Sequence, residues 1–189
     1  MKVIPTKIPD VLIIEPNIFN DERGYFMESY NKKLFTKHGL VHEFVQDNQS
    51  KSRTAGTIRG LHYQLAPYAQ TKIVRCVQGA IYDVAVDMRQ DSPTYGQWVG
   101  EILTADNGRQ LLVPKGFAHG FCTLTPDTII AYKVDEFYHG ESDRAIIYND
   151  PDLAIGWPVS TPFLSSKDLA APTLRECENN FYMSGEIYE

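Results

Sequence analysis

The sequence predicts an all-β fold, a sandwich or barrel of short strands. Runs rich in β-branched and aromatic residues recur along the 189 residues, with turn-forming residues between them. Helical periodicity is confined to two short segments. The motifs Gly-x-Gly-x-x-Gly and Gly-x-x-x-x-Gly-Lys-Ser/Thr do not occur in the chain. These observations favour many strands and little helix, and they argue against a doubly wound nucleotide fold.

Seven segments have the composition of strands: Val11 to Ile14, Lys72 to Val77, Ala80 to Asp87, Trp98 to Thr104, Gln110 to Val113, Thr128 to Asp135 and Ala145 to Tyr148. Gln78 and Gly79 separate two of these runs and predict a two-residue hairpin, because glycine can supply a positive φ. Alternation along the strand then puts Lys72, Val74 and Cys76 on one face.

Two short segments have helical character. Asn31 is placed to cap a short helix that carries Leu34 and Phe35 and ends at Gly39. Near the other end of the chain, a serine at position 165 or 166 can start a turn before Pro172. Both helices are too short to form a layer of their own.

Length and charge limit the domain number and the partners. The absence of linkers and repeats predicts one domain over residues 1–189. The net charge of −6 gives no general attraction to nucleic acid or to an anionic membrane, so an anionic ligand must be held by a few placed cations. No apolar run is long enough to span a bilayer, and the first residues lack the apolar region of a signal peptide. Cys76, Cys122 and Cys177 lack Cys-x-x-Cys spacing, which favours reduced thiols and a cytoplasmic protein.

Five polar residues lie in settings that suggest chemistry. Arg59 and His62 flank a glycine, and Lys72 begins a strand face that is otherwise apolar. His119 lies between two glycines in an aromatic segment, and Tyr132 projects from the apolar face of its strand. Taken singly, each fits a packed or surface residue. The five histidines contain no His-x-His, so we expect no metal site.

Ten segments in a fixed order carry a family resemblance over about residues 1 to 175. They are Asp21 to Gly24 with Glu28, Phe44 to Asn48, Arg59 to Gln64, Lys72 to Arg75, Asp83 to Asp87, Ser92 to Gly96, Gly116 to Phe121, Tyr132 with Lys133, Asn149 to Pro151, and Leu164 to Asp168. Through them the chain resembles the dTDP-4-dehydrorhamnose 3,5-epimerase family. The resemblance implies a cupin-type jelly-roll β-sandwich with short peripheral helices, and an enzyme of dTDP-L-rhamnose and surface-polysaccharide biosynthesis that needs no cofactor.

The resemblance also implies catalytic roles. In this family a C4 ketone acidifies the sugar protons on C3 and C5, and each centre is inverted by removing a proton from one face and returning one to the other. His62 matches the base and Asp168 its carboxylate partner. Tyr132 matches the acid on the opposite face, and Lys72 the cation beside the developing enolate.

Further matched positions concern the nucleotide. Arg23 and Arg59 match diphosphate ligands, His119 lies near the phosphates and the sugar, and Tyr138 matches an aromatic that stacks on thymine. The remaining matches contact deoxyribose, thymine or phosphate: Glu28, Gln46, Asp47, Asn48, Asp143 and Lys167. Asp83 is a candidate to support His119 from a neighbouring strand.

The family resemblance implies a homodimer whose N-terminal arm, about residues 1–30, lies in the interface. It does not cover the tail, about residues 176–189, whose role stays open. Three other functions also remain open: an epimerase that inverts only one centre of a dTDP-4-keto sugar, a metal-dependent cupin, and a nucleotide-sugar-binding module without activity.

Overall fold

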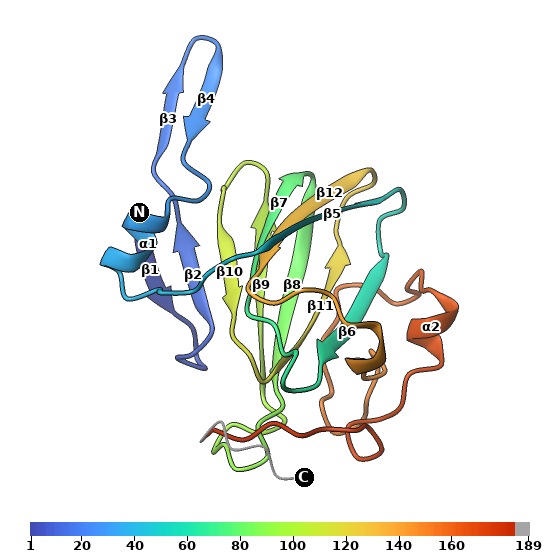
Figure 1. The fold of residues 1–189 in the computed structure, drawn as a ribbon. Helices are drawn as coiled ribbons and strands as arrows, with labels where there is room; N and C mark the ends of the chain where they lie inside the picture. Colours follow the sequence, from blue (N-terminus) through green and yellow to red (C-terminus); the bar gives the residue numbers. More distant parts are fainter. Residues whose placement is uncertain (184–189) are drawn as a thin grey trace.

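Two antiparallel sheets face each other in the computed structural model, which describes residues 1–183 (Figure 1). The six-stranded sheet has the order β1 (Lys2–Pro5), β2 (Leu12–Glu15), β10 (Gln110–Val113), β7 (Lys72–Gln78), β12 (Thr128–Val134) and β5 (Gln46–Ser52). The five-stranded sheet has the order β13 (Asp143–Ala145), β6 (Ile58–Gln64), β11 (Phe117–Thr123), β8 (Ala80–Asp87) and β9 (Trp98–Thr104). The predicted all-β sandwich with short peripheral helices is confirmed.

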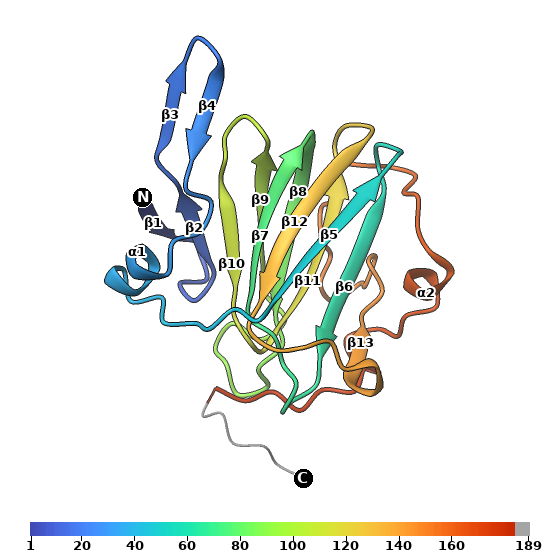
Figure 2. The same ribbon diagram turned by 45° about the horizontal axis from the view of Figure 1, so that its top comes forward.

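From β5 onward the chain passes repeatedly between the layers. β5, β7, β10 and β12 belong to one sheet, and β6, β8, β9, β11 and β13 belong to the other. Figure 2 shows β7, β12 and β5 in front of β8 and β11. From β5 to β13, consecutive strands therefore lie in opposite sheets, except β8 and β9, which pair with each other. Any space between the sheets is lined from both sides.

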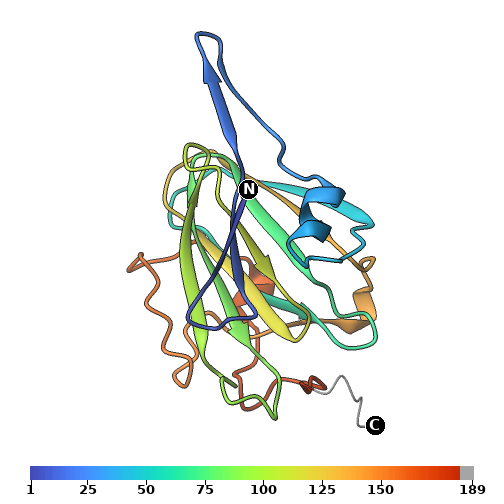
Figure 3. The ribbon, with the colours of Figure 1, turned by 90° about the vertical axis from the view of Figure 1, so that its left-hand side faces the viewer.

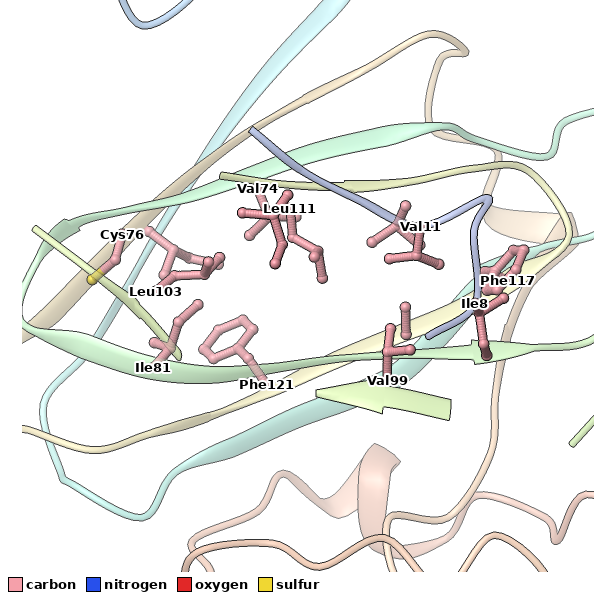
Figure 4. Close-up of a cluster of buried hydrophobic side chains, with 14 residues drawn as sticks. Ile8, Val11, Val74, Cys76, Ile81, Val99, Leu103, Leu111, Phe117 and Phe121 are labelled. Atoms are coloured by element: carbon pink, nitrogen blue, oxygen red, sulfur yellow. The ribbon is translucent and has the colours of Figure 1, made fainter. Parts of the chain in front are cut away.

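The main core lies between the layers. Its side chains come from both sheets, with Val74 and Leu111 on one side and Ile81, Val99 and Phe121 on the other (Figure 4). Burying one such side chain stabilises the fold by about 1.5–3 kcal/mol. This core holds the two sheets together.

Each sheet is also covered on its outer face. The helix α1 (Lys32–Lys37) packs Phe35 against Ile73 and Leu112 of the six-stranded sheet. Asn31 caps this helix and Gly39 follows it with a φ of 80°, as the sequence predicts. On the other side, residues 146–181 cover the five-stranded sheet in a second apolar cluster.

The tail is docked as far as it is described. Phe181 is buried in the second cluster, and the Tyr63 hydroxyl donates to the Glu178 carbonyl at 2.6 Å. Asn180 exchanges hydrogen bonds with the backbone of Ala66. Residues 184–189 of the predicted tail lie outside the described residues. The described part of the tail, residues 176–183, packs Phe181 on the outer face of the five-stranded sheet.

The predicted hairpin at Gln78 and Gly79 is wrong. The two strands do form, but β7 lies in the six-stranded sheet and β8 in the five-stranded sheet, so they do not pair. Gly79 has the expected positive φ of 82°, and a Cβ there would lie 2.4 Å from the Thr125 hydroxyl. The turn is a corner between sheets, and local sequence does not distinguish it from a hairpin.

Most predicted strands agree with the structure, but one is displaced and several observed strands are absent from the prediction. β8, β9 and β10 have the predicted residues, whereas the predicted strand from Ala145 to Tyr148 appears upstream as β13. The strands β1, β5, β6 and β11 were not predicted, and neither was the hairpin of β3 (Ile18–Asp21) and β4 (Gly24–Met27). Glycine and polar residues interrupt the apolar alternation in β5, β6 and β11.

Candidate active site

A cavity of about 390 Å³ lies between the sheets. It is lined by polar and apolar residues from both sheets and by a C-terminal segment: Ser50, Thr57, Ile58, Arg59, His62, Lys72, His119, Phe121, Ile130, Tyr132, Phe163, Leu164, Ser165, Lys167 and Asp168. Seven of the predicted site residues therefore share one cavity: Arg59, His62, Lys72, His119, Tyr132, Lys167 and Asp168.

His62 and Asp168 form a close pair. His62 lies on β6, and its Nε2 is 2.6 Å from Oδ1 of Asp168 on the short helix α2 (Ser166–Leu169). Ser165 caps this helix by accepting a hydrogen bond from the Asp168 backbone N–H. Burial favours the protonated acid, but the hydrogen bond and charge of His62 outweigh it and lower the pKa of Asp168. Asp168 is thus a carboxylate at neutral pH and can stabilise a protonated imidazole.

A second histidine–carboxylate pair lies deeper. His119 on β11 is the cross-strand partner of His62 on β6, so their side chains share the inner face of the sheet. Its Nε2 is 2.8 Å from Oδ1 of Asp83 on the adjacent strand β8. Gly60 and Gly120 let β6 and β11 approach each other closely beside the two histidines, because a Cβ on Gly60 would lie 2.5 Å from the Gly120 Cα. Asp83 thus contacts His119 from the neighbouring strand, as the sequence analysis suggests.

Lys72 is an ammonium group among apolar neighbours. It begins β7 and is 9% exposed, and its face continues into the core with Val74 and Cys76, as strand alternation predicts. Desolvation lowers the pKa of Lys72 to about 8, although the charges of Asp143 and Asp83 act in the opposite direction. A buried cation is therefore held beside the cavity.

Tyr132 lies across the cavity from His62. It is on β12 of the six-stranded sheet, on the same face as Ile130, whereas His62 is on β6 of the five-stranded sheet. Burial raises the pKa of the Tyr132 phenol, with a smaller opposing effect from the charge of Arg59. Tyr132 is thus a protonated phenol at neutral pH. The cavity has an imidazole on one wall and a phenol on the facing wall.

A smaller cavity of about 210 Å³ adjoins the first and shares His62, Lys72 and Tyr132 with it. Its other polar residues include Gln46, Asn48, Gln64, Gln70, Tyr138 and Asp143. The Gln46 side-chain amide donates to Asn48 Oδ1 at 2.8 Å, and the Tyr138 hydroxyl donates to Asp143 at 3.4 Å. Lys167 forms an ion pair with Asp143, which connects the two cavities. Amides, a phenol and an ion pair are thus gathered at one end of the site.

Arg59 lies at the other end of the first cavity. Its Nε donates to Ser52 at 3.1 Å, and Nη2 donates to the Lys51 carbonyl at 3.2 Å. These contacts fix the guanidinium at the cavity wall without a carboxylate partner among the described residues. An uncompensated arginine in this position suits an anionic ligand.

Three predicted ligands lie away from the cavity within this chain. Arg23 lies in the β3–β4 turn and pairs with Asp21, and Glu28 follows β4 and accepts from Asn31. The hairpin stands away from the sandwich (Figure 3). Asp47 alternates with Gln46 and Asn48 along β5, so its side chain lies on the outer face, where it pairs with Lys133 at 2.7 Å. Within this chain Asp47 lines neither of the two site cavities.

Gln64 supports the site, although the sequence analysis does not identify it. It lies two residues after His62 on β6, is 4% exposed, and uses all of its side-chain groups. The amide donates to the carbonyls of Tyr68 and Phe137, and the Gln64 side-chain oxygen accepts from the His139 backbone. Gln64 thus anchors the loop that carries Tyr138, and no local sequence signal identifies such a bridge.

Within residues 1–183 there is no group of three or more His, Cys, Asp or Glu side chains arranged to hold a metal ion. The helices in that part of the chain are all too short to cross a bilayer.

Comparison with known proteins gives consistent matches. The family model described as dTDP-4-dehydrorhamnose 3,5-epimerase matches residues 5–176. The dTDP-4-dehydrorhamnose 3,5-epimerase of Shigella flexneri is 57% identical over 170 residues, which are 89% of this chain and 93% of the relative. This agreement extends over nearly the whole chain.

Solved structures share the fold. The dTDP-4-dehydrorhamnose 3,5-epimerase of Bacillus anthracis, solved with TDP and PPi bound, has a TM-score of 0.89 and 60% identity over 91% of this chain and 98% of that one. The dTDP-6-deoxy-D-glucose-3,5-epimerase of Legionella pneumophila, solved with dTDP-4-keto-L-rhamnose, has a TM-score of 0.89 and 48% identity over 93% of each chain. The jelly-roll prediction is confirmed, and the chain belongs to the dTDP-4-dehydrorhamnose 3,5-epimerase family.

Proposed function

We propose that this enzyme inverts C3 and C5 of dTDP-4-dehydro-6-deoxy-D-glucose and so forms dTDP-4-dehydro-L-rhamnose. The main support is the arrangement of His62 and Tyr132 on facing walls of one cavity. Inversion needs a base on one face of the sugar ring and an acid on the other. A ring held between the two sheets meets these two requirements at once.

The proposed proton path starts at His62. The ring nitrogen that is not bonded to Asp168 removes the proton next to the C4 ketone, and the Asp168 carboxylate stabilises the resulting imidazolium. The electron pair moves onto the ketone oxygen, where the Lys72 ammonium stabilises the enolate. Tyr132 returns a proton to the opposite face of the carbon. Proton exchange with solvent then returns His62 to the neutral imidazole and Tyr132 to the phenol, ready for the second centre.

The nucleotide extends toward the mouth of the cavity. Arg59 and Lys167 supply positive charge for the diphosphate, with His119 near the phosphates and the sugar. Gln46 and Asn48 offer amides to the edge of thymine, and Tyr138 offers a ring to its face. Asp143 holds Lys167 and Tyr138 in place. Asp47 has no contact in this proposal, because its side chain lies on the outer face of β5.

Deuterium incorporation tests the reaction. In deuterated water the purified protein is expected to place deuterium at both C3 and C5 of the dTDP-4-keto sugar, read by NMR, because each inversion exchanges one carbon-bound proton with solvent. The rate is expected to be unchanged after exhaustive chelation, and a loss would favour the metal-dependent alternative. Label at C3 or C5 alone would indicate a single-centre epimerase. The absence of label at both carbons would favour a nucleotide-sugar-binding module without activity.

A homodimer completes this site in the proposal. The β3–β4 hairpin exposes Phe19, Tyr25 and Phe26, the last with 66% of its surface exposed. An isolated two-stranded hairpin is only marginally stable in water, so these aromatics call for a covering surface. A second copy supplies that surface, and the hairpin of each copy brings Arg23 and Glu28 to the cavity of the other. The arm formed by residues 1–30 is then the interface of a single-domain subunit.

Complementation between subunits tests this arrangement. Arg23→Ala weakens substrate binding and His62→Ala removes the base, so each variant alone is expected to have little activity. Co-expression of the two is expected to restore activity, because one site in each mixed dimer has His62 from one subunit and Arg23 from the other. If Arg23 acts within its own chain, the mixture stays as inactive as its parents. Sedimentation checks that mixed dimers form.

The same proposal gives the enzyme a cytoplasmic location. Cys76, Cys122 and Cys177 are all unpaired thiols. Unpaired thiols are typical of reducing compartments.

A further inference from the structure

Asp83 is a charged group in the middle of an apolar layer. It lies on β8 between Ile81 and Ala85, which belong to the main core, and it is 0% exposed. Its Oδ1 accepts from His119, but Oδ2 has no hydrogen-bond partner within residues 1–183. A buried carboxylate oxygen without a partner is costly, and such groups are concentrated at functional sites.

Lys72 presents the complementary feature from the opposite sheet. It lies on β7, its side chain shares the inner face of that strand with Val74 and Cys76, and it forms no hydrogen bond within the described residues. The sandwich therefore buries an ammonium in one sheet and a half-paired carboxylate in the other. The charge of Asp83 acts on Lys72 and favours its protonated form.

The other carboxylate that acts on Lys72 has partners of its own. Asp143 lies toward the mouth and is engaged by Lys167 and by the Tyr138 hydroxyl. Among residues 1–183, Asp83 is the carboxylate that combines complete burial with an unused oxygen. The remaining titratable or charged groups that share a cavity with Lys72 are Arg59, His62 and Tyr63 on β6, His119 on β11, Tyr132 on β12, Tyr138 in the loop after β12, and Lys167 and Asp168 on α2.

We infer that Asp83 is a positioning residue for the epimerisation: one oxygen fixes the His119 ring, and the other is the counter-charge that keeps Lys72 an ammonium facing the enolate. This inference rests on the proposed function for the role of Lys72. It gives β8, which contributes no residue to the cavity wall, a part in the reaction. Asp83 acts through Lys72 and His119 and does not touch the substrate.

The variant Asp83→Asn separates charge from shape. The asparagine oxygen can still accept from His119, but the negative charge is gone. Removing a nearby opposite charge changes a pKa by about one to three units, so the alkaline limb of kcat/KM is expected to move by that amount toward lower pH. The loss of activity should therefore be much larger at pH 8, where a shift of one unit already costs about fivefold, than at pH 6.

Asp87→Asn is the matched control. Asp87 lies on the same strand, is also 0% exposed, and is held by Arg89, Ser92 and Thr94 away from the cavity. This variant is expected to melt at a lower temperature without moving the alkaline limb. If Asp83→Asn lowers the rate equally at every pH, or leaves the limb in place, Asp83 has only a structural role and the inference is overturned.

A second readout does not depend on turnover. In protein labelled with ¹³C at lysine Cε, the Lys72 signal is assigned by its loss in Lys72→Met, and its titration is followed by NMR. Asp83→Asn is expected to move this titration to lower pH, and an unchanged titration would overturn the inference. If the unmodified protein places no deuterium in the sugar while this titration still moves, the proposed function fails and the charge coupling between Asp83 and Lys72 stands.

Discussion

Replacing His62 with alanine is expected to abolish turnover while the fold is preserved. A positioned proton-transfer group contributes about a hundred- to ten-thousand-fold to the rate, and no other imidazole in the described chain is paired with Asp168. The His62 side chain is 34% exposed at the cavity, so its removal leaves the main core unchanged. Deuterium exchange at C3 and C5 measures the loss, and circular dichroism checks the fold.

The control for this prediction is His38→Ala. His38 is an exposed residue at the C-terminus of α1, outside both site cavities, and its replacement is expected to leave exchange unchanged. Exchange at the unmodified rate in His62→Ala would remove His62 from the mechanism. A folded His62→Ala variant that binds TDP but exchanges nothing would separate the chemistry from nucleotide binding.

Replacing Lys72 with methionine is expected to change activity and stability in opposite directions. In the proposed mechanism this change removes the cation that stabilises the enolate, so kcat is expected to fall by about a hundred- to a thousandfold. The folded protein should become more stable at pH 7, because burial lowers the pKa of Lys72 from 10.5 to about 8. That shift corresponds to about 3 kcal/mol against the protonated form. Urea unfolding and exchange kinetics measure the two effects.

The pH dependence gives the sign of the stability effect. Between pH 8 and pH 10.5 the unfolded chain binds the Lys72 proton more strongly than the folded chain, so the stability of the unmodified protein rises with pH across this window. The advantage of Lys72→Met should be present at pH 7 and disappear toward pH 10.5. A variant that is less stable at pH 7 would show that the attraction of nearby carboxylates exceeds the desolvation cost. Undiminished exchange would exclude Lys72 from the chemistry.

Much of the strand content is predictable from sequence, and the exceptions are instructive. β8, β9 and β10 have strong apolar patterns because their side chains only have to pack. β5, β6 and β11 were missed because they carry the polar and glycine residues of the site, among them His62 and His119. The same residues that make a strand functional remove the alternation by which strands are predicted.

The site shows a similar division. Alternation correctly grouped Lys72 with Val74 and Cys76, since a face of one strand is a local property. It could not show that Asp83 reaches His119, which depends on β8 and β11 being neighbours in the sheet. Nor could it show that Asp47 lies outside the cavity, because the inner face of β5 is set by its pairing with β12.

The sequence by itself determined the class of fold, the short capped helices, the faces of several strands and, through ten ordered segments, the family. These properties depend on residues close together in the chain or on a pattern spread along all of it. Only the tertiary structure decided that β7 and β8 lie in opposite sheets, that His62 and Tyr132 face one another, and that Asp83 and Lys72 are buried between the layers. The physical reason is that those relations follow from the packing of two sheets, which local spacing does not encode.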